Sequence, residues 1–284
     1  MILSLVTPTA LPSVLAVLAY GLASLLAQTQ SSGSTPPRDR AIWAALSLGW
    51  LAHAVSIVFD TWSWSSPHPA ARFGFAPALS VTSWLVLAVY AAENRQLGLP
   101  TIRRALAILA ATMVALAWVF PGQEHPASGS PWAPVHWVLG FASYGLMGAA
   151  LMHAALMSHA ERQLRATRHG EVKRPLLSPP QALGMPLLRL ESLTMRFVAA
   201  GFAMLTLTLV LGAWFANPWR WDHKSIFSVL SWGVFATLLI GRQRFGWRGR
   251  QAVRWLYAGS ALLLLAYVGS RFVLEVLLHR APPV

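Results

Sequence analysis

The side chains best suited to chemistry in this chain are its histidines, because the sequence contains no cysteine. The lack of cysteine excludes disulfides, thiolate metal sites and thiol nucleophiles. Of the nine histidines, His53 and His153 fall within long apolar segments, and His136 begins another. An ionisable residue inside a membrane span is costly and is by default a candidate functional residue. These three histidines are therefore the first candidates for functional residues.

His53 lies among small and polar residues that share one face of a predicted helix: Gly49, Ala52, Ser56 and Asp60. Such a face should contact other helices. At 1.5 Å per residue, His53 is roughly 10 Å below Asp60. Its position is compatible with an interhelical hydrogen bond and equally with metal ligation.

The most informative polar segment is 219–224, which reads Trp-Arg-Trp-Asp-His-Lys. Asp222, followed by Ser225, predicts an N-terminal cap for the next helix. Six tryptophans fall on the predicted external side: Trp62, Trp64, Trp132, Trp214, Trp219 and Trp221. A planar, hydrophobic molecule with carboxylates would find flat apolar surfaces and cations there, and histidines such as His223 could coordinate its metal. An aromatic belt at the headgroup level is the alternative interpretation.

His136 and His279 lie at the ends of predicted helices. His136 begins one helix, and His153 is 17 residues further on, roughly 25 Å away, so the two cannot share a small site. His279 follows Tyr267, Arg271 and Glu275 at steps of four residues. His279 could meet His136 across the bundle if their helices approach each other.

The elements that carry these residues are membrane spans, since 56% of the residues are apolar, 11% are charged and the mean hydropathy is +0.52. The pattern predicts an all-α fold, a polytopic helical bundle forming one integral-membrane domain over residues 1–284. Eight spans are predicted, at 9–29, 41–60, 75–93, 101–120, 134–158, 192–216, 224–241 and 251–276.

Basic residues orient these spans. Assigning loops alternately places 17 of the 22 Lys/Arg on one side and five on the other. Cytoplasmic loops retain Lys/Arg, so both termini are expected in the periplasm. The longest cytoplasmic connection is a basic loop at about 159–191, and the external Trp-rich turn is at about 214–224. The basic clusters alternate with spans, which indicates contact with the lipid bilayer and no nucleic acid.

Three stretches resemble a known family. They are His136 to Tyr144 (HWVLGFASY), Trp219 to Lys224 together with 246–250 (GWRGR), and Tyr267 to Ser270 with His279 at the end of the same helix. They are similar to the cytochrome c assembly superfamily, of the CcsA/ResC type, and in particular to its short HemX-like and YpjD-like members. The resemblance covers most of the chain and is strongest after Pro134.

The resemblance implies a haem-handling protein of the bacterial inner membrane, which binds or presents haem b at the periplasmic face. It implies that His136 and His279 are the axial pair, that Trp219, Trp221 and Asp222 contact the porphyrin, and that His53 is an intramembrane ligand. His223 stands where the family usually has proline and is the next candidate ligand.

The resemblance implies as partners haem and either an apocytochrome or another inner-membrane protein. Enzymatic activity is left open. The alternative function is a non-enzymatic membrane subunit that stabilises or regulates another membrane protein.

Overall fold

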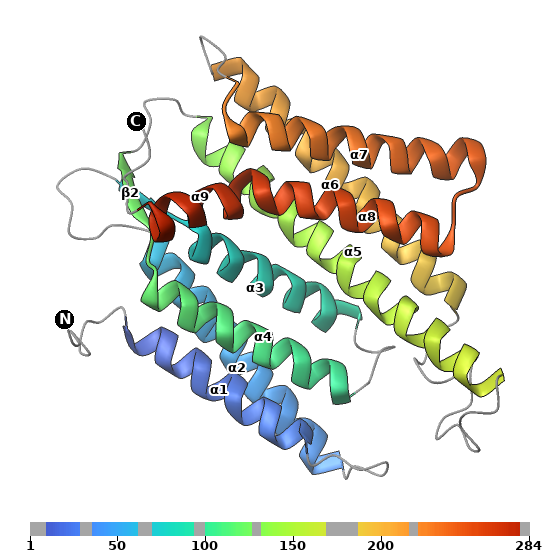
Figure 1. Cartoon of the computed structure of the whole chain (residues 1–284). Coiled ribbons are helices and arrows are strands. Elements are labelled where there is room, and N and C mark those ends of the chain that lie inside the picture. Colours follow the sequence, from blue (N-terminus) through green and yellow to red (C-terminus); the bar gives the residue numbers. More distant parts are fainter. Residues whose placement is uncertain are drawn as a thin grey trace. The chain divides into compact units, whose positions relative to one another are not determined.

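The structure is a computed structural model, and it describes residues 10–28, 36–61, 70–93, 100–126, 132–168, 187–215 and 221–278. Eight helices in these ranges are long and apolar enough to span a membrane, which confirms the all-α prediction (Figure 1). They are α1 (Ala10–Gln28), α2 (Pro36–Thr61), α3 (Phe75–Glu93), α4 (Pro100–Val119), α5 (Ala133–Arg168), α6 (Leu187–Phe215), α7 (His223–Phe245) and α8 (Gly249–Leu264). The last span continues from α8 through η1 (Leu265–Gly269), α9 (Ser270–Phe272) and η2 (Val273–Leu277).

The helices extend further than hydropathy indicated at the predicted basic loop. Residues 159–168 continue α5 and residues 187–191 belong to α6, so the predicted loop 159–191 is shorter. Arg, Gln, Leu and Ala favour the helical state, and a helix can continue into water where apolar residues stop. Residues 169–186 lie outside the described part of the chain.

A short antiparallel pair of strands was not predicted. β1 (Ala70–Phe73) pairs with β2 (Gln123–Pro126), with Phe73 opposite Gln123. Gly122 precedes β2 with φ +77°, and a Cβ there would come within 2.6 Å of the Phe73 carbonyl oxygen. Glycine at 122 is therefore required both by the backbone conformation and by this close approach.

The chain divides into two compact units. Unit 1 comprises the described residues of Met1–Leu87, Leu99–Ala133 and Val268–Val284, and unit 2 those of Ala88–Gly98 and Pro134–Tyr267. Both α3 and the last span contribute residues to both units. The prediction of one domain over 1–284 stays a prediction.

In unit 1, α1 packs against α2 and α4 through small side chains. The buried residues of α1 recur at helical spacing: Ala10, Ser13, Ala16, Ala19, Tyr20, Ala23 and Ala27. Small residues let helix backbones approach closely, which drives helix association where apolar side chains gain nothing by leaving lipid. Trp50 of α2 and Trp84 of α3 stack at 4.6 Å and each indole donates to the other's backbone carbonyl, which fixes the register of these helices.

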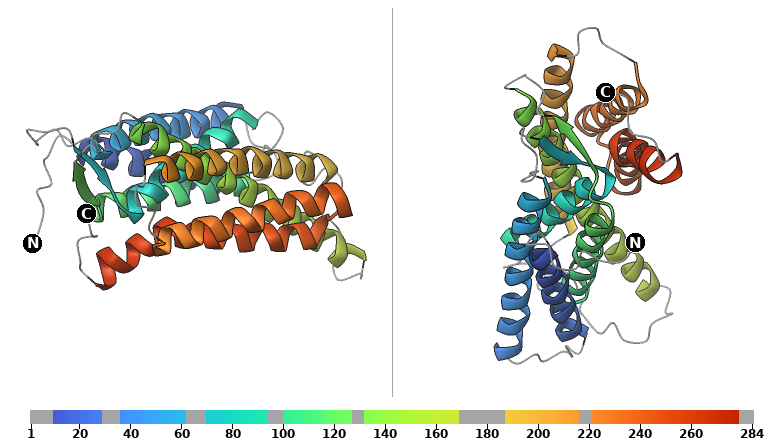
Figure 2. Two further views of the ribbon diagram at one scale, coloured as in Figure 1. Left: turned by 90° about the horizontal axis from the view of Figure 1, so that it is seen from above. Right: turned by 90° about the vertical axis from the view of Figure 1, so that its left-hand side faces the viewer.

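In unit 2, α7 and α8 form an antiparallel pair and lie side by side in each view (Figure 2). Ser231 donates to the Gly259 carbonyl at 2.9 Å, and the Phe235 ring covers Gly259 so closely that a Cβ there would be 2.7 Å from it. Gly246, at φ +66°, ends α7 in the left-handed conformation.

The first π-helical turn of the last span, η1, forms where a side chain enters the hydrogen-bond ladder. The Tyr144 hydroxyl of α5 donates to the Leu263 carbonyl and also contacts the backbone of Tyr267, the residue four positions further on. Insertion of a side chain between a carbonyl and its usual partner widens a helix. Tyr144 therefore accounts for η1, which starts at Leu265.

Candidate functional site

The candidate site is built around His136, in the first turn of α5 in unit 2. The side chain is half-buried, and its Cε1 lies only 3.0 Å from the position that a Cβ on Gly212 would take. The imidazole also interacts with the backbone of Thr208, one turn earlier on α6. The absence of a side chain at Gly212 thus gives the imidazole its place against α6.

Below His136, α5 packs on α6 along a seam that comprises Gly140, Ser143 and Met147 of α5 and Gly201 and Thr208 of α6. This seam sets the height and rotation of α5. Gly140 faces Thr208, whose Cγ2 would lie 3.8 Å from a Cβ on that glycine. Ser143 donates to the Gly201 carbonyl at 3.2 Å, and Met147 packs against the same glycine. The face of α5 that carries Gly140, Ser143 and Met147 thus packs on α6, and it holds His136 at the end of the seam.

Asp222 caps α7, as its spacing to Ser225 predicts. One carboxylate oxygen, Oδ1, accepts from both the backbone N–H and the hydroxyl of Ser225, each at 2.8 Å. Burial opposes ionisation of Asp222, but these hydrogen bonds together with nearby Lys224 and His223 outweigh it and lower the pKa of the carboxyl group. A structural role is thereby established for Asp222, independent of any ligand.

Exposed indoles stand at the same end of unit 2 as His136. Trp214, two residues after Gly212, is 81% exposed, and Trp221, next to the cap, is 68% exposed. His223 is also exposed and begins α7. An imidazole, two indole faces and the Lys224 ammonium can thus meet a flat apolar ligand that carries acidic groups. An aromatic belt at the headgroup level remains the structural alternative.

His53, in unit 1, has hydrogen-bond partners for both ring nitrogens. It is fully buried, with Nδ1 3.3 Å from the Tyr20 hydroxyl and Nε2 2.8 Å from Ser80 Oγ. A metal ligand needs one ring nitrogen without such a partner. Of the two roles that the sequence left open for His53, this arrangement favours the interhelical hydrogen bond. Tyr20 and Ser80 lie on other helices, and no sequence spacing connects them to His53.

Comparison with known sequences decides the family. The sequence profile of the family described as "Cytochrome C assembly protein" matches residues 72–278, most of the chain. The chain belongs to this family. It is a multi-pass membrane protein of cytochrome c biogenesis.

Individual relatives support the assignment of this cytochrome c assembly protein. It is 30% identical over 197 residues to the inner membrane protein YpjD of Escherichia coli K12. The matched region covers 68% of the chain and 70% of YpjD. It is 29% identical over 221 residues to the cytochrome c biogenesis protein CcsA of Prochlorococcus marinus MIT 9313, with the same coverage of the two chains. No solved structure gave a significant match.

A second histidine of this cytochrome c assembly protein belongs to a buried pair that sequence reasoning missed. His153 is fully buried, with Nδ1 2.8 Å from the Ala149 carbonyl and Nε2 2.7 Å from Glu93 Oε2. The carbonyl can only accept, so Nδ1 carries a hydrogen, and Nε2 and Glu93 must share one further proton. Glu93 ends its span in the sequence, which gives no signal that it contacts a histidine 60 residues later.

Two predicted site residues, Trp219 and His279, lie outside the described residues. The axial pair of His136 and His279 therefore stays a prediction. Within the described ranges, no three His, Asp or Glu side chains gather closely enough to hold a metal ion by themselves. Haem iron takes most of its ligands from porphyrin nitrogens, so a haem site does not require such a group of side chains.

Proposed function

We propose that this cytochrome c biogenesis protein binds or presents haem b at the periplasmic end of unit 2, in the bacterial inner membrane. The observation that carries the proposal is the placement of His136: a half-buried imidazole seated over Gly212, at the end of the unit where Trp214 and Trp221 are exposed. Its orientation by tight packing is what a ligand needs, because a loosely held imidazole would lose entropy on binding iron.

The residues of this end fit a haem. A ligand histidine usually has its other ring N–H directed to a backbone carbonyl or carboxylate, and the interaction of His136 with the Thr208 backbone is of this kind. Trp214 and Trp221 offer apolar faces to a porphyrin, and Lys224 offers a cation to its propionates. When bound, haem supplies the iron and the vinyl groups, while the protein contributes ligation and orientation.

His279 is the proposed second axial ligand, and His223 is the next candidate if His279 does not serve.

The haem proposal places both termini in the periplasm, as the distribution of basic residues predicts. Reporter fusions at Val284 and within residues 169–186 should give opposite location signals. Identical signals would contradict the even number of spans.

The alternative is a non-enzymatic membrane subunit that stabilises or regulates another membrane protein. Exposed tryptophans at the end of spans also suit that function, since indoles favour the headgroup level. The two functions differ in the visible spectrum of the protein as purified.

The test is an absorption spectrum of the full chain purified from cells supplied with a haem precursor. The haem proposal predicts a Soret band with a haem content near one per chain, and α and β bands after reduction with dithionite. A protein that is folded by circular dichroism yet carries no haem, and takes none up on titration, would favour the membrane-subunit function.

A further inference from the structure

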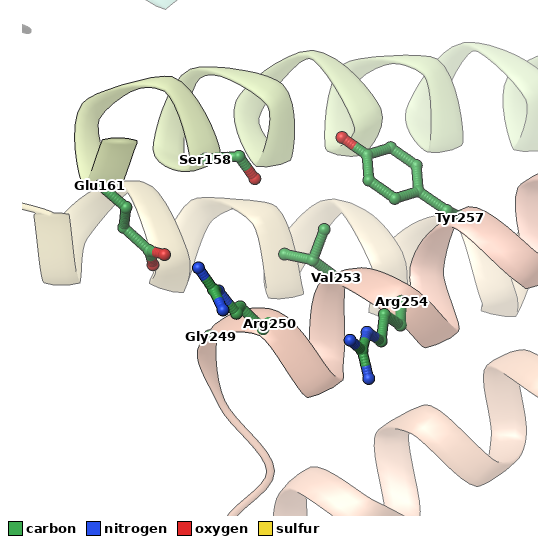
Figure 3. A pocket seen from close by; sticks show the side chains of 7 residues that line it. All are labelled: Ser158, Glu161, Gly249, Arg250, Val253, Arg254 and Tyr257. Carbon is green, nitrogen blue, oxygen red and sulfur yellow. The ribbon is translucent and has the colours of Figure 1, made fainter. Parts of the chain in front are cut away.

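A small cavity lies in unit 2 between α5 and the beginning of α8, at the end that the basic residues predict to be cytoplasmic. Its volume is about 210 Å³. Figure 3 shows its lining: Ser158 and Glu161 of α5, and Gly249, Arg250, Val253, Arg254 and Tyr257 of α8. It is smaller than the roughly 300–1,000 Å³ of sites that enclose a drug-sized ligand, so it suits a headgroup and not a porphyrin.

The charges around this cavity favour a monoanion. Arg250 and Arg254 are exposed and stand one helical turn apart on α8, and Glu161 of α5 lies on the side of Arg250 (Figure 3). Two guanidinium groups and one carboxylate leave one net positive charge. In the part of the chain that the structure describes, neither guanidinium takes part in an ion pair. The cavity also lies at the N-terminal end of α8, where the helix dipole adds to the attraction for an anion.

The polar and apolar groups of the lining match a phosphodiester attached to a lipid. Planar guanidinium groups bind phosphate oxygens with paired hydrogen bonds, and the hydroxyl of Ser158 adds a further donor. Val253 is buried at the floor of the cavity, and the Tyr257 ring is 44% exposed beside it. Tyr257 is seven residues after Arg250, roughly 10 Å further along the helix. The cavity therefore changes from cationic to apolar in the direction in which a phospholipid would run.

We propose that this cavity binds the phosphodiester headgroup of a membrane phospholipid, with Arg250 and Arg254 on the phosphate. A phosphodiester carries one negative charge, which matches the net charge of the lining. Free phosphate shares the same chemistry, but the cavity opens where a membrane span begins, and there headgroups are the abundant phosphates. This site is independent of the haem proposal, because it depends on other residues at the other end of unit 2.

The experiment compares lipid retention by native mass spectrometry of the full chain in detergent, with phosphatidylethanolamine or phosphatidylglycerol added. The variant R250Q/R254Q removes both guanidinium groups. The control R244Q/R248Q removes the same charge from exposed positions beside the cavity that do not line it. Diacylglycerol with the same acyl chains tests the need for the phosphate, and inorganic phosphate tests the need for the lipid.

The wild-type chain and R244Q/R248Q should each retain one phospholipid, and R250Q/R254Q should retain it at least about tenfold less. Diacylglycerol should not be retained, and millimolar inorganic phosphate should not displace the lipid. Equal retention by the two double variants would overturn the proposal. Displacement of the lipid by inorganic phosphate would overturn the assignment to a lipid headgroup.

Discussion

Gly212→Ala tests the packing that seats His136. The new Cβ would lie 3.0 Å from His136 Cε1, whereas ordinary carbon contacts are about 3.5–4.0 Å. The imidazole or α6 must therefore move by several tenths of an ångström. Overpacking of this kind costs about 1–3 kcal/mol.

Gly140→Ala is the matched control, because it adds the same methyl group to the same seam. Its Cβ would meet Thr208 Cγ2 at 3.8 Å, an ordinary contact. Both variants gain the helix propensity of alanine over glycine, about 1 kcal/mol, so this term cancels in the comparison. Gly212→Ala should therefore be less stable than Gly140→Ala by about 1–3 kcal/mol.

Thermal unfolding of both purified variants, followed by tryptophan fluorescence, measures this difference as a lower Tm for Gly212→Ala. The same variant should also lose haem more readily in a dilution assay, since its imidazole is displaced. Equal stability of the two variants would refute the packing of His136 against Gly212. If Gly212→Ala is less stable but retains haem as well as Gly140→Ala does, His136 packs against Gly212 but is not the haem ligand.

Variants at three further positions test contacts elsewhere. Tyr144→Phe should lower stability by about 1–3 kcal/mol and speed amide hydrogen exchange near Leu263, because a buried carbonyl loses its donor. Asp222→Ala should cost about 1 kcal/mol as the cap is lost. Because folding lowers the pKa of this carboxyl, the wild-type advantage in Tm should begin to shrink as the pH falls below about 4 and should be lost once the pH is below the pKa in the folded protein. Glu93→Ala should reduce Tm more than Glu93→Gln, since glutamine can still donate to His153.

Each of these has a clear contrary result. Unchanged exchange in Tyr144→Phe would mean that the hydroxyl does not maintain the π-helical turn. An Asp222→Ala penalty that does not shrink at all as the pH falls below about 4 would mean that the ionised carboxylate is not the cap. Equal loss in the two Glu93 variants would mean that the pair needs a charge that glutamine cannot supply.

The spans were predictable because hydropathy is a property of composition over about 20 residues. Asp222 was predictable for a related reason: a cap depends on residues three positions apart in the chain. The end of α5 at Arg168 was not predictable from hydropathy, because a helix can continue into water where the apolar residues stop.

Partners on different helices could not be read from the sequence. His53 was located correctly on a buried face, but its hydrogen bonds with Tyr20 and Ser80 depend on how three helices pack. The pair of Glu93 with His153 depends on packing in the same way. Periodicity indicates which face of a helix is buried and leaves open what that face contacts.

The central claim, haem ligation by His136, is tested most directly by the spectrum of His136→Ala with and without added imidazole. The account predicts that a six-coordinate low-spin haem in the wild-type protein becomes five-coordinate in this variant, and that imidazole restores the original spectrum. The matched control is His159→Ala, which removes an exposed imidazole from the same helix and should leave the spectrum unchanged. A wild-type spectrum retained by His136→Ala would contradict the claim and place the ligand elsewhere.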